Sequence, residues 1–128
     1  MTKYLGIDYG LSHVGLATSE STLATPLPSL KNDVSLLSRL HSLIQSEKIT
    51  HIICGLPEGR LDPLIRRFAH QLTKISGIKV VPHPETLSTQ EAKQKLRESG
   101  ANRTKRHNDH AYAACLILED YLELTATS

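Results

Sequence analysis

Near its start the chain reads Lys3-Tyr4-Leu5-Gly6-Ile7-Asp8-Tyr9-Gly10, a short apolar run followed by an acid and a glycine. The apolar run predicts a buried strand that ends at Asp8, and Gly10 is typical of the turn after such a strand. We expect a carboxylate at the end of a central strand to be exposed and held rigidly by the sheet, where small neighbouring residues let a phosphate come close. The alternative is a turn aspartate that bonds its own backbone, as in many Asp-x-Gly sequences. This segment alone does not decide between the two interpretations.

Outward from this strand, the pattern predicts one α/β domain over residues 1–128. Residues 14–18 are expected to pair with the first strand as a hairpin, and residues 23–27 to form an edge strand that two prolines interrupt. Strands and amphipathic helices then alternate as helix 32–47, strand 50–54, helix 61–76, strand 78–81, helix 88–100, a basic loop 101–108 and a helix from about residue 109. This order implies a mixed five-stranded sheet, an antiparallel hairpin plus parallel strands, flanked by helices.

Composition excludes several classes of protein. With 39% apolar and 22% charged residues, a chain of 128 residues can close a single core. No apolar run approaches the roughly 20 residues of a membrane-spanning helix, and early charges exclude a signal peptide, so we expect a cytoplasmic protein that does not contact a membrane. Cys54 and Cys115 lie in apolar patterns without a C-x-x-C partner, which predicts two buried thiols.

Charge is unevenly distributed in the last third of the chain. Residues 93–107 hold six cations and one anion, whereas residues 109–128 hold four anions and no Lys or Arg. A solvated helix and tail are the usual explanation, but the same pattern suits an enzyme that holds a polyanion beside a carboxylate cluster. The cations that we expect to contact nucleic acid here are Lys93, Arg97, Arg103, Lys105 and Arg106.

Two further acids, Glu85 and Asp109, lie at the ends of predicted elements. Parallel strand order would place Glu85 near the same sheet edge as Asp8. Taken alone, Glu85 could simply stabilise the dipole of the helix that follows it, and Asp109 could cap the helix that it begins. Three carboxylates together are costly unless a cation lies among them, and oxygen ligands favour Mg²⁺ or Mn²⁺. Two such ions could activate water and stabilise the leaving oxygen in phosphodiester cleavage.

These segments resemble the YqgF/RuvX family, whose members are identified as Holliday junction resolvases and as nucleases that process the 5′ end of pre-16S ribosomal RNA. The resemblance spans nearly the whole chain and rests on Gly6-Ile7-Asp8-Tyr9-Gly10, Gly15-Leu16-Ala17, Gly55-Leu56-Pro57, Glu85-Thr86-Leu87-Ser88-Thr89 and Leu116-Ile117-Leu118-Glu119-Asp120-Tyr121-Leu122. It implies a ribonuclease H-like fold and a metal-dependent endonuclease acting on an rRNA precursor or branched DNA. It also implies that Asp8, Glu85 and Asp109 are catalytic and hold the Mg²⁺ or Mn²⁺. A resolvase would need two active sites and hence a homodimer, whereas an RNA-trimming enzyme could act as a monomer.

The chain departs from the family pattern at two motifs and in the short stretch Glu58-Gly59-Arg60, which leads straight into the next predicted helix. Ser12-His13 stands where the family usually has an arginine, and Pro84-Glu85-Thr86 where it commonly reads Asp-Glu-Arg. Both changes remove a phosphate-binding cation, which Arg60 or the cations of residues 103–106 could replace. Four histidines lie near the acids in sequence and could serve as a general base or an extra ligand: His13, His83, His107 and His110. His107 and His110, beside Asp109, are the favoured candidates.

Two other functions are consistent with parts of the sequence. The departures favour a non-catalytic nucleic-acid-binding module in ribosome assembly or transcription, whereas the three acids favour the nuclease. Gly-Ile-Asp-x-Gly also opens the phosphate loop of sugar kinases and actin-like ATPases. Those proteins need two domains of this fold to enclose a nucleotide, and 128 residues supply one.

Overall fold

The computed structural model describes residues 1–56, 62–85 and 103–126, with the helix backbone alone at 103–109 and 126. The described elements are β1 (Tyr4–Asp8), β2 (His13–Ser19), β3 (Thr25–Lys31), α1 (Leu36–Ser46), β4 (His51–Leu56), α2 (Pro63–Ser76), β5 (Val80–Pro84) and α4 (Arg103–Ala126). The helix predicted over 88–100 lies outside the described residues. None of the helices in the described ranges is apolar over a length that would span a bilayer.

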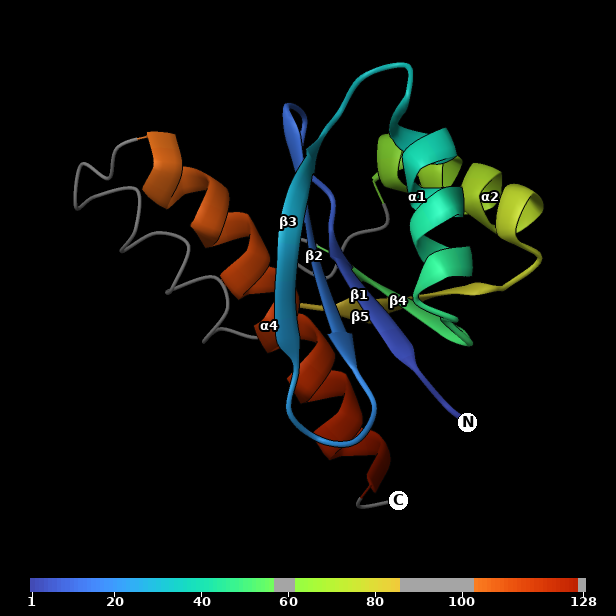
Figure 1. Ribbon diagram of the computed structural model, residues 1–128, viewed down its shortest axis with the longest axis vertical. Coiled ribbons are helices and arrows are strands. Elements are labelled where there is room, and N and C mark those ends of the chain that lie inside the picture. The colour runs from blue at the N-terminus through green and yellow to red at the C-terminus, as the bar shows by residue number, and fades with distance from the viewer. Residues whose placement is uncertain (57–61, 86–102, 127–128) are drawn as a thin grey trace.

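The strands form one sheet in the order β3-β2-β1-β4-β5. β2 pairs antiparallel with both β1 and β3, whereas β1 with β4 and β4 with β5 are parallel. In Figure 1, α1 and α2 lie on one side of the sheet and α4 on the other. The predicted mixed five-stranded sheet flanked by helices is therefore confirmed.

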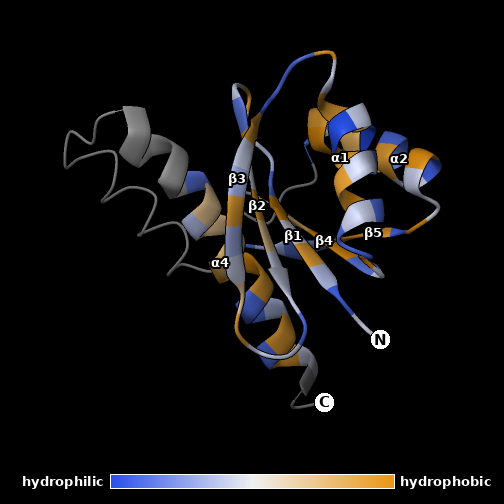
Figure 2. Cartoon of the chain, viewed as in Figure 1, coloured by the Kyte–Doolittle hydropathy of each residue, from blue (hydrophilic) through white to orange (hydrophobic). Residues whose placement is uncertain are grey.

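Alternation along the strands divides the interior into two cores. On β1, Leu5 and Ile7 belong to the core beneath α1 and α2, whereas Gly6 faces Leu118 of α4. Figure 2 shows hydrophobic residues along the central strands and mixed hydrophobic and hydrophilic turns in the covering helices, as this layered packing requires. The core beneath α4 consists of Ala17, Ile53, Ala114, Cys115, Ile117, Leu118 and Leu122.

Prolines lie inside β5, although residues 78–81 were expected to form the strand and Pro82 and Pro84 to end it. The backbone N–H of Glu85 donates to the Leu56 carbonyl of β4 at 3.1 Å. Because successive residues of a strand point their N–H groups to opposite sides, the nitrogens of Pro82 and Pro84 face away from β4. On this outer edge a missing N–H costs no ladder hydrogen bond, so the strand continues through both prolines.

The basic loop predicted over residues 101–108 is also wrong where the structure describes it, because α4 begins at Arg103. Residues 103–108 contain no Gly or Pro, and their Thr, Lys, Arg, His and Asn side chains are all tolerated in a helix. A polar, basic composition alone therefore did not indicate a loop.

Two other elements begin later than predicted. β3 lies at Thr25–Lys31, so it begins two residues and ends four residues later than the predicted strand. It does occupy the edge of the sheet, as predicted. α1 begins at Leu36 because Asp33 accepts hydrogen bonds from the backbone N–H and the hydroxyl of Ser35, at 2.9 and 2.6 Å. This closes a separate turn ahead of the helix.

The ends of α2 follow the sequence signals closely. Asp62 caps its start by accepting a hydrogen bond from the Leu64 N–H at 2.8 Å, and Pro63 is the first helical residue. Gly77 ends the helix with φ 75°, a left-handed conformation that favours glycine. The predicted stop at Gly77 is confirmed.

Both cysteine thiols should resist alkylation in the folded protein. Cys54 and Cys115 are buried, as predicted, and burial, with a smaller effect of Glu119, raises the pKa of the Cys115 thiol to about 11. Since the thiolate is the nucleophile, roughly one Cys115 thiol in 10³ would be reactive at pH 8. Thiol titration at pH 8 should detect almost no reaction before guanidinium is added and two thiols afterwards. Rapid reaction of either thiol in the native protein would contradict this packing.

Candidate active site

Asp8 ends β1 on the side of the sheet that α4 covers. Asp8 is 3% exposed, and in the sheet it is paired with Gly15 on β2. Alternation places it on the same face as Gly6, which meets α4. Asp8 thus lies at the carboxyl end of a central strand, as predicted. It is buried, however, where the sequence predicted an exposed acid, because α4 covers this face of the sheet.

Glycines on three neighbouring strands let α4 approach this face closely. A Cβ on Gly6 would lie 2.8 Å from Leu118 Cβ, and one on Gly15 would overlap the backbone carbonyl of His110. A Cβ on Gly55 of β4 would collide with the Ile117 side chain. The absence of these side chains seats the α4 backbone directly on the sheet beside Asp8.

This approach brings His110 of α4 to Asp8. The His110 Nδ1 lies 3.3 Å from the Asp8 Oδ2, and the side chains are 33% and 5% exposed. The His110 ring also stacks against that of His13 on β2, with centroids 6.4 Å apart and an interplanar angle of 27°. Of the histidines proposed from the sequence, His110 therefore does contact a site carboxylate, and His13 joins the same cluster.

The turn after β1 is held by a residue from a distant segment. The Asn32 side chain donates to the Gly10 carbonyl at 2.7 Å, and its backbone N–H donates to the Ser12 carbonyl at 2.8 Å. These two bonds fix the glycine turn against the connection between β3 and α1. The backbone that follows Asp8 is thereby held in one conformation.

Glu85 lies at the same edge and on the same face. It directly follows β5, is 7% exposed, and is separated from Asp8 only by β4 in a run of three parallel strands. A Cβ on Gly55 would lie 3.3 Å from the Glu85 Cγ while also meeting α4, so the Glu85 side chain is on the α4 face. The predicted juxtaposition of Asp8 and Glu85 at one sheet edge is confirmed.

Asp109 directly precedes His110 in α4, where the structure describes its backbone but not its side chain. Its participation stays a prediction, as does that of His107. The same holds for the predicted nucleic-acid contacts: Arg60, Lys93 and Arg97 lie outside the described residues, and of Arg103, Lys105 and Arg106 only the helix backbone is described.

The donor set fits a hard divalent cation. Among the side chains that the structure describes, no three His, Cys, Asp or Glu residues form a metal site. The described part supplies Asp8 and Glu85, two buried carboxylates on one face, and Asp109 would be the third oxygen donor. Burial of like charges is costly without a cation, and oxygen ligands of this kind suit Mg²⁺ or Mn²⁺.

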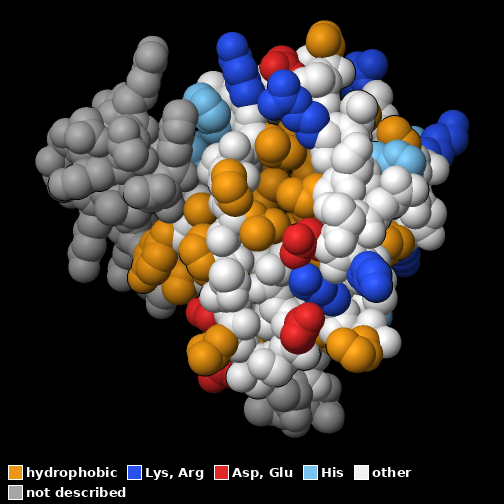
Figure 3. Space-filling model, in the orientation of Figure 1, with side chains coloured by type: hydrophobic (Ala, Val, Ile, Leu, Met, Phe, Trp, Pro, Cys, Tyr) orange, Lys and Arg blue, Asp and Glu red, His pale blue; other side chains and the backbone are white. Residues whose placement is uncertain are grey.

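Charged side chains occur at this end of the molecule. In Figure 3, several Lys and Arg side chains lie at the top of the view, the end of the sheet where β1 stops and α1 begins. Others lie in the lower half of the same view with acidic side chains beside them, so this face carries charges of both signs.

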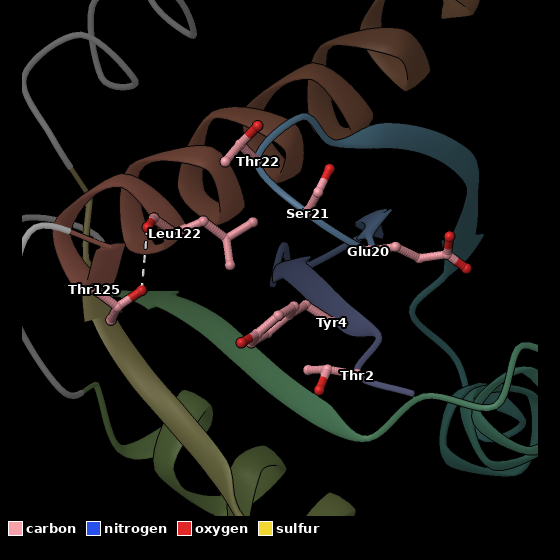
Figure 4. A pocket seen from close by; sticks show the side chains of 7 residues that line it. All are labelled: Thr2, Tyr4, Glu20, Ser21, Thr22, Leu122 and Thr125. Atoms are coloured by element: carbon pink, nitrogen blue, oxygen red, sulfur yellow. Dashed lines mark hydrogen bonds between the residues drawn. The ribbon is translucent and has the colours of Figure 1, made fainter.

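A pocket of about 390 Å³ lies elsewhere (Figure 4). Tyr4, at the opposite end of β1 from Asp8, lines it, so it contains none of the predicted site residues. Its lining residues are Thr2, Tyr4, Glu20, Ser21, Thr22, Leu122 and Thr125.

One contact near Glu85 was not anticipated from the sequence. His83 Nε2 and Asp120 Oδ2 are 2.6 Å apart, joining β5 to α4. The sequence signal was the placement of His83 two residues before Glu85, which alternation puts on the same face. Its partner on α4 could not be identified without the packing.

Comparison with known proteins agrees with this geometry. Residues 2–124 match the family described as RuvX: Holliday junction resolvase. A protein of Rickettsia canadensis is 31% identical over 95% of this chain and 86% of its own, and one of Syntrophus aciditrophicus is 33% identical over 94% and 88%. Each carries the provisional name of a pre-16S rRNA nuclease.

Solved structures show the same architecture. Thermus thermophilus RuvC in complex with a Holliday junction substrate superposes with a TM-score of 0.59 at 14% identity, over 98% of this chain and 96% of that one. The Fowlpox virus resolvase superposes with a TM-score of 0.52 at 14% identity, over 98% and 96%. The predicted ribonuclease H-like fold is confirmed. With the family match over residues 2–124, these findings establish that the chain belongs to the RuvX family.

Proposed function

We propose that the chain is a metal-dependent endonuclease that hydrolyses phosphodiester bonds of structured nucleic acid. Processing of the 5′ end of pre-16S rRNA is the first candidate reaction and Holliday junction resolution the second. The observation that carries the proposal is the pair of buried carboxylates, Asp8 and Glu85, on the α4 face of one sheet edge in a RuvX-family chain. The names of the relatives and the junction-bound RuvC support the substrate class.

Asp8, Glu85 and Asp109 would hold Mg²⁺ or Mn²⁺. When bound, the metal would activate a water and stabilise the leaving oxygen of the phosphodiester. The residues around the carboxylates prepare the site: His110 restrains the Asp8 carboxylate, and Gly10 lets the His13 backbone and the His110 ring pack closely beside the turn after β1. Burial excludes bulk water from the acids and so strengthens their attraction for a cation.

Substrate binding should depend steeply on salt through the basic residues. We propose that Arg60, Lys93, Arg97, Arg103, Lys105 and Arg106 contact phosphates. Replacing Arg103 and Arg106 with Gln should weaken binding and flatten the plot of log affinity against log salt by about 0.9 for each duplex phosphate that is no longer neutralised. Lys79→Gln, at the far end of β5 from Glu85, is the matched control. Fluorescence anisotropy at several salt concentrations measures both; equal slopes for all proteins would contradict these contacts.

The substrate can be assigned by a direct comparison. The purified protein, with Mg²⁺ or Mn²⁺, is offered a pre-16S rRNA fragment and a four-way DNA junction side by side, with Asp8→Asn protein as the control for contaminating nuclease. Cleavage of the RNA by a monomer would support rRNA processing in the cytoplasm. Paired cuts in the junction by a homodimer would support resolution. Cleavage of neither, together with no saturable Mn²⁺ binding, would favour the non-catalytic binding module.

A further inference from the structure

The His83–Asp120 pair is a close contact between two elements that carry site residues. The His83 Nε2 lies 2.6 Å from the Asp120 Oδ2, a short distance typical of a hydrogen bond with a charged partner. His83 is 9% exposed. Its ring packs edge to face with the Tyr121 ring, with the two centroids 5.6 Å apart and an interplanar angle of 89°. Packing on two sides therefore holds the imidazole in one orientation, and neither partner has a role in the proposed chemistry.

The pair joins α4 to β5, the strand at the outer edge of the sheet, which has a hydrogen-bonded neighbour on one side only. That neighbour is β4. Next to its end, the Glu85 N–H donates to the Leu56 carbonyl at 3.1 Å. His83, two residues earlier, faces α4 like Glu85 and there meets Asp120. The strand end that positions Glu85 is thus held by β4 in the sheet and by α4 above it.

The same helix also holds Asp8. His110 contacts the Asp8 carboxylate, and Asp120, ten residues further along α4, contacts His83. A helix rises 1.5 Å per residue, so these two contacts are about 15 Å apart on one rigid element. Since glycines seat α4 directly on the sheet, the helix connects the strand of Asp8 to the strand of Glu85.

We infer that His83 and Asp120 are positioning residues that fix Glu85 relative to Asp8 by tying the end of β5 to α4. They touch neither metal nor substrate in this role. The consequence for metal affinity rests on the proposed function, whereas the positioning of the Glu85 backbone does not. Hydrogen exchange and metal binding therefore test the two parts separately.

Amide hydrogen exchange followed by NMR tests the positioning. Asp120→Ala should speed exchange of the Glu85 amide about tenfold, and Asp120→Asn, which keeps a hydrogen-bond acceptor, should restore most of the protection. His83→Phe, which keeps a ring beside Tyr121 but loses the donor, should behave like Asp120→Ala. Glu47→Ala is the matched control, because it breaks the 2.9 Å Lys3–Glu47 pair near the other end of β1. Exchange at Glu85 that is unchanged, or that rises equally in Glu47→Ala, would overturn the inference.

Mn²⁺ binding and kinetics test what the positioning does. At a temperature where all variants are folded, Asp120→Ala and His83→Phe should weaken Mn²⁺ binding about tenfold and lower kcat, with little change in KM for nucleic acid. A loss of stability alone would not weaken Mn²⁺ binding and lower kcat in the folded protein while leaving KM almost unchanged. If Glu85 exchange accelerates but wild-type protein binds no Mn²⁺, the positioning holds and the proposed metal-dependent function fails. If wild type binds Mn²⁺ and the variants bind it equally well, the function stands and positioning for the metal is refuted.

Discussion

Asp8→Asn should abolish cleavage, lowering kcat by about 10³-fold or more, while the protein stays folded and still binds nucleic acid. Asparagine has nearly the shape of aspartate and keeps one oxygen acceptor, so it can remain at the end of β1. What it removes is the negative charge of a residue that is 3% exposed, where the attraction for a divalent cation is weakly screened. A 10³-fold loss corresponds to roughly 4 kcal/mol of transition-state stabilisation.

Single-turnover cleavage and nucleic-acid binding should be measured on the same protein samples. Asp33→Asn is the matched control, because it makes the same chemical change on an exposed turn directly after β3. That control should cleave at the wild-type rate. Wild-type cleavage by Asp8→Asn would refute the role assigned to Asp8, and unfolding of the variant would show instead that the carboxylate is structural.

Gly15→Ala should remove stability and activity together. The new Cβ would overlap the His110 carbonyl, and a backbone atom of a packed helix cannot turn aside as a side chain can. α4 must therefore move away from β2, at a cost of about 1–3 kcal/mol for overpacking. The same movement displaces His110 from Asp8 and shifts the backbone of Asp109, and a misplacement of about 1 Å can cost about 10²-fold in rate.

Gly77→Ala separates these two effects. Gly77 has φ 75°, and no atom lies within 4 Å of the position that an alanine methyl would take, so alanine there costs about 1–2 kcal/mol of backbone strain without touching α4. This variant should unfold earlier yet cleave at the wild-type rate when folded. Urea unfolding gives the stabilities, and cleavage is compared below both transitions. Full activity in folded Gly15→Ala would show that close seating of α4 is not required.

Local sequence predicted the part of the site that depends on strand ends. Asp8 and Glu85 each follow a short apolar run, and parallel order then brings such ends to one edge of the sheet. The end of α2 at Gly77 could also be predicted, because a helix stop depends on only a few neighbouring residues. These features needed no knowledge of which distant side chains pack together.

Other features depended on packing and were missed. Pro82 is compatible with β5 only because its nitrogen faces the outer edge, which requires knowing the strand order. Likewise, the 2.6 Å contact of His83 with Asp120 joins residues 37 apart in sequence. The start of α4 at Arg103, by contrast, depends on local sequence: residues 103–108 contain no Gly or Pro, and a basic composition does not by itself prevent a helix.

Anomalous diffraction from crystals grown with Mn²⁺ tests the proposed metal site most directly. We expect a manganese peak bounded by the carboxylate oxygens of Asp8 and Glu85, with Asp109 completing the set, and loss of that peak in Asp8→Asn crystals. A well-ordered structure at saturating Mn²⁺ in which these carboxylates diverge and no peak lies between them would contradict the metal-dependent nuclease.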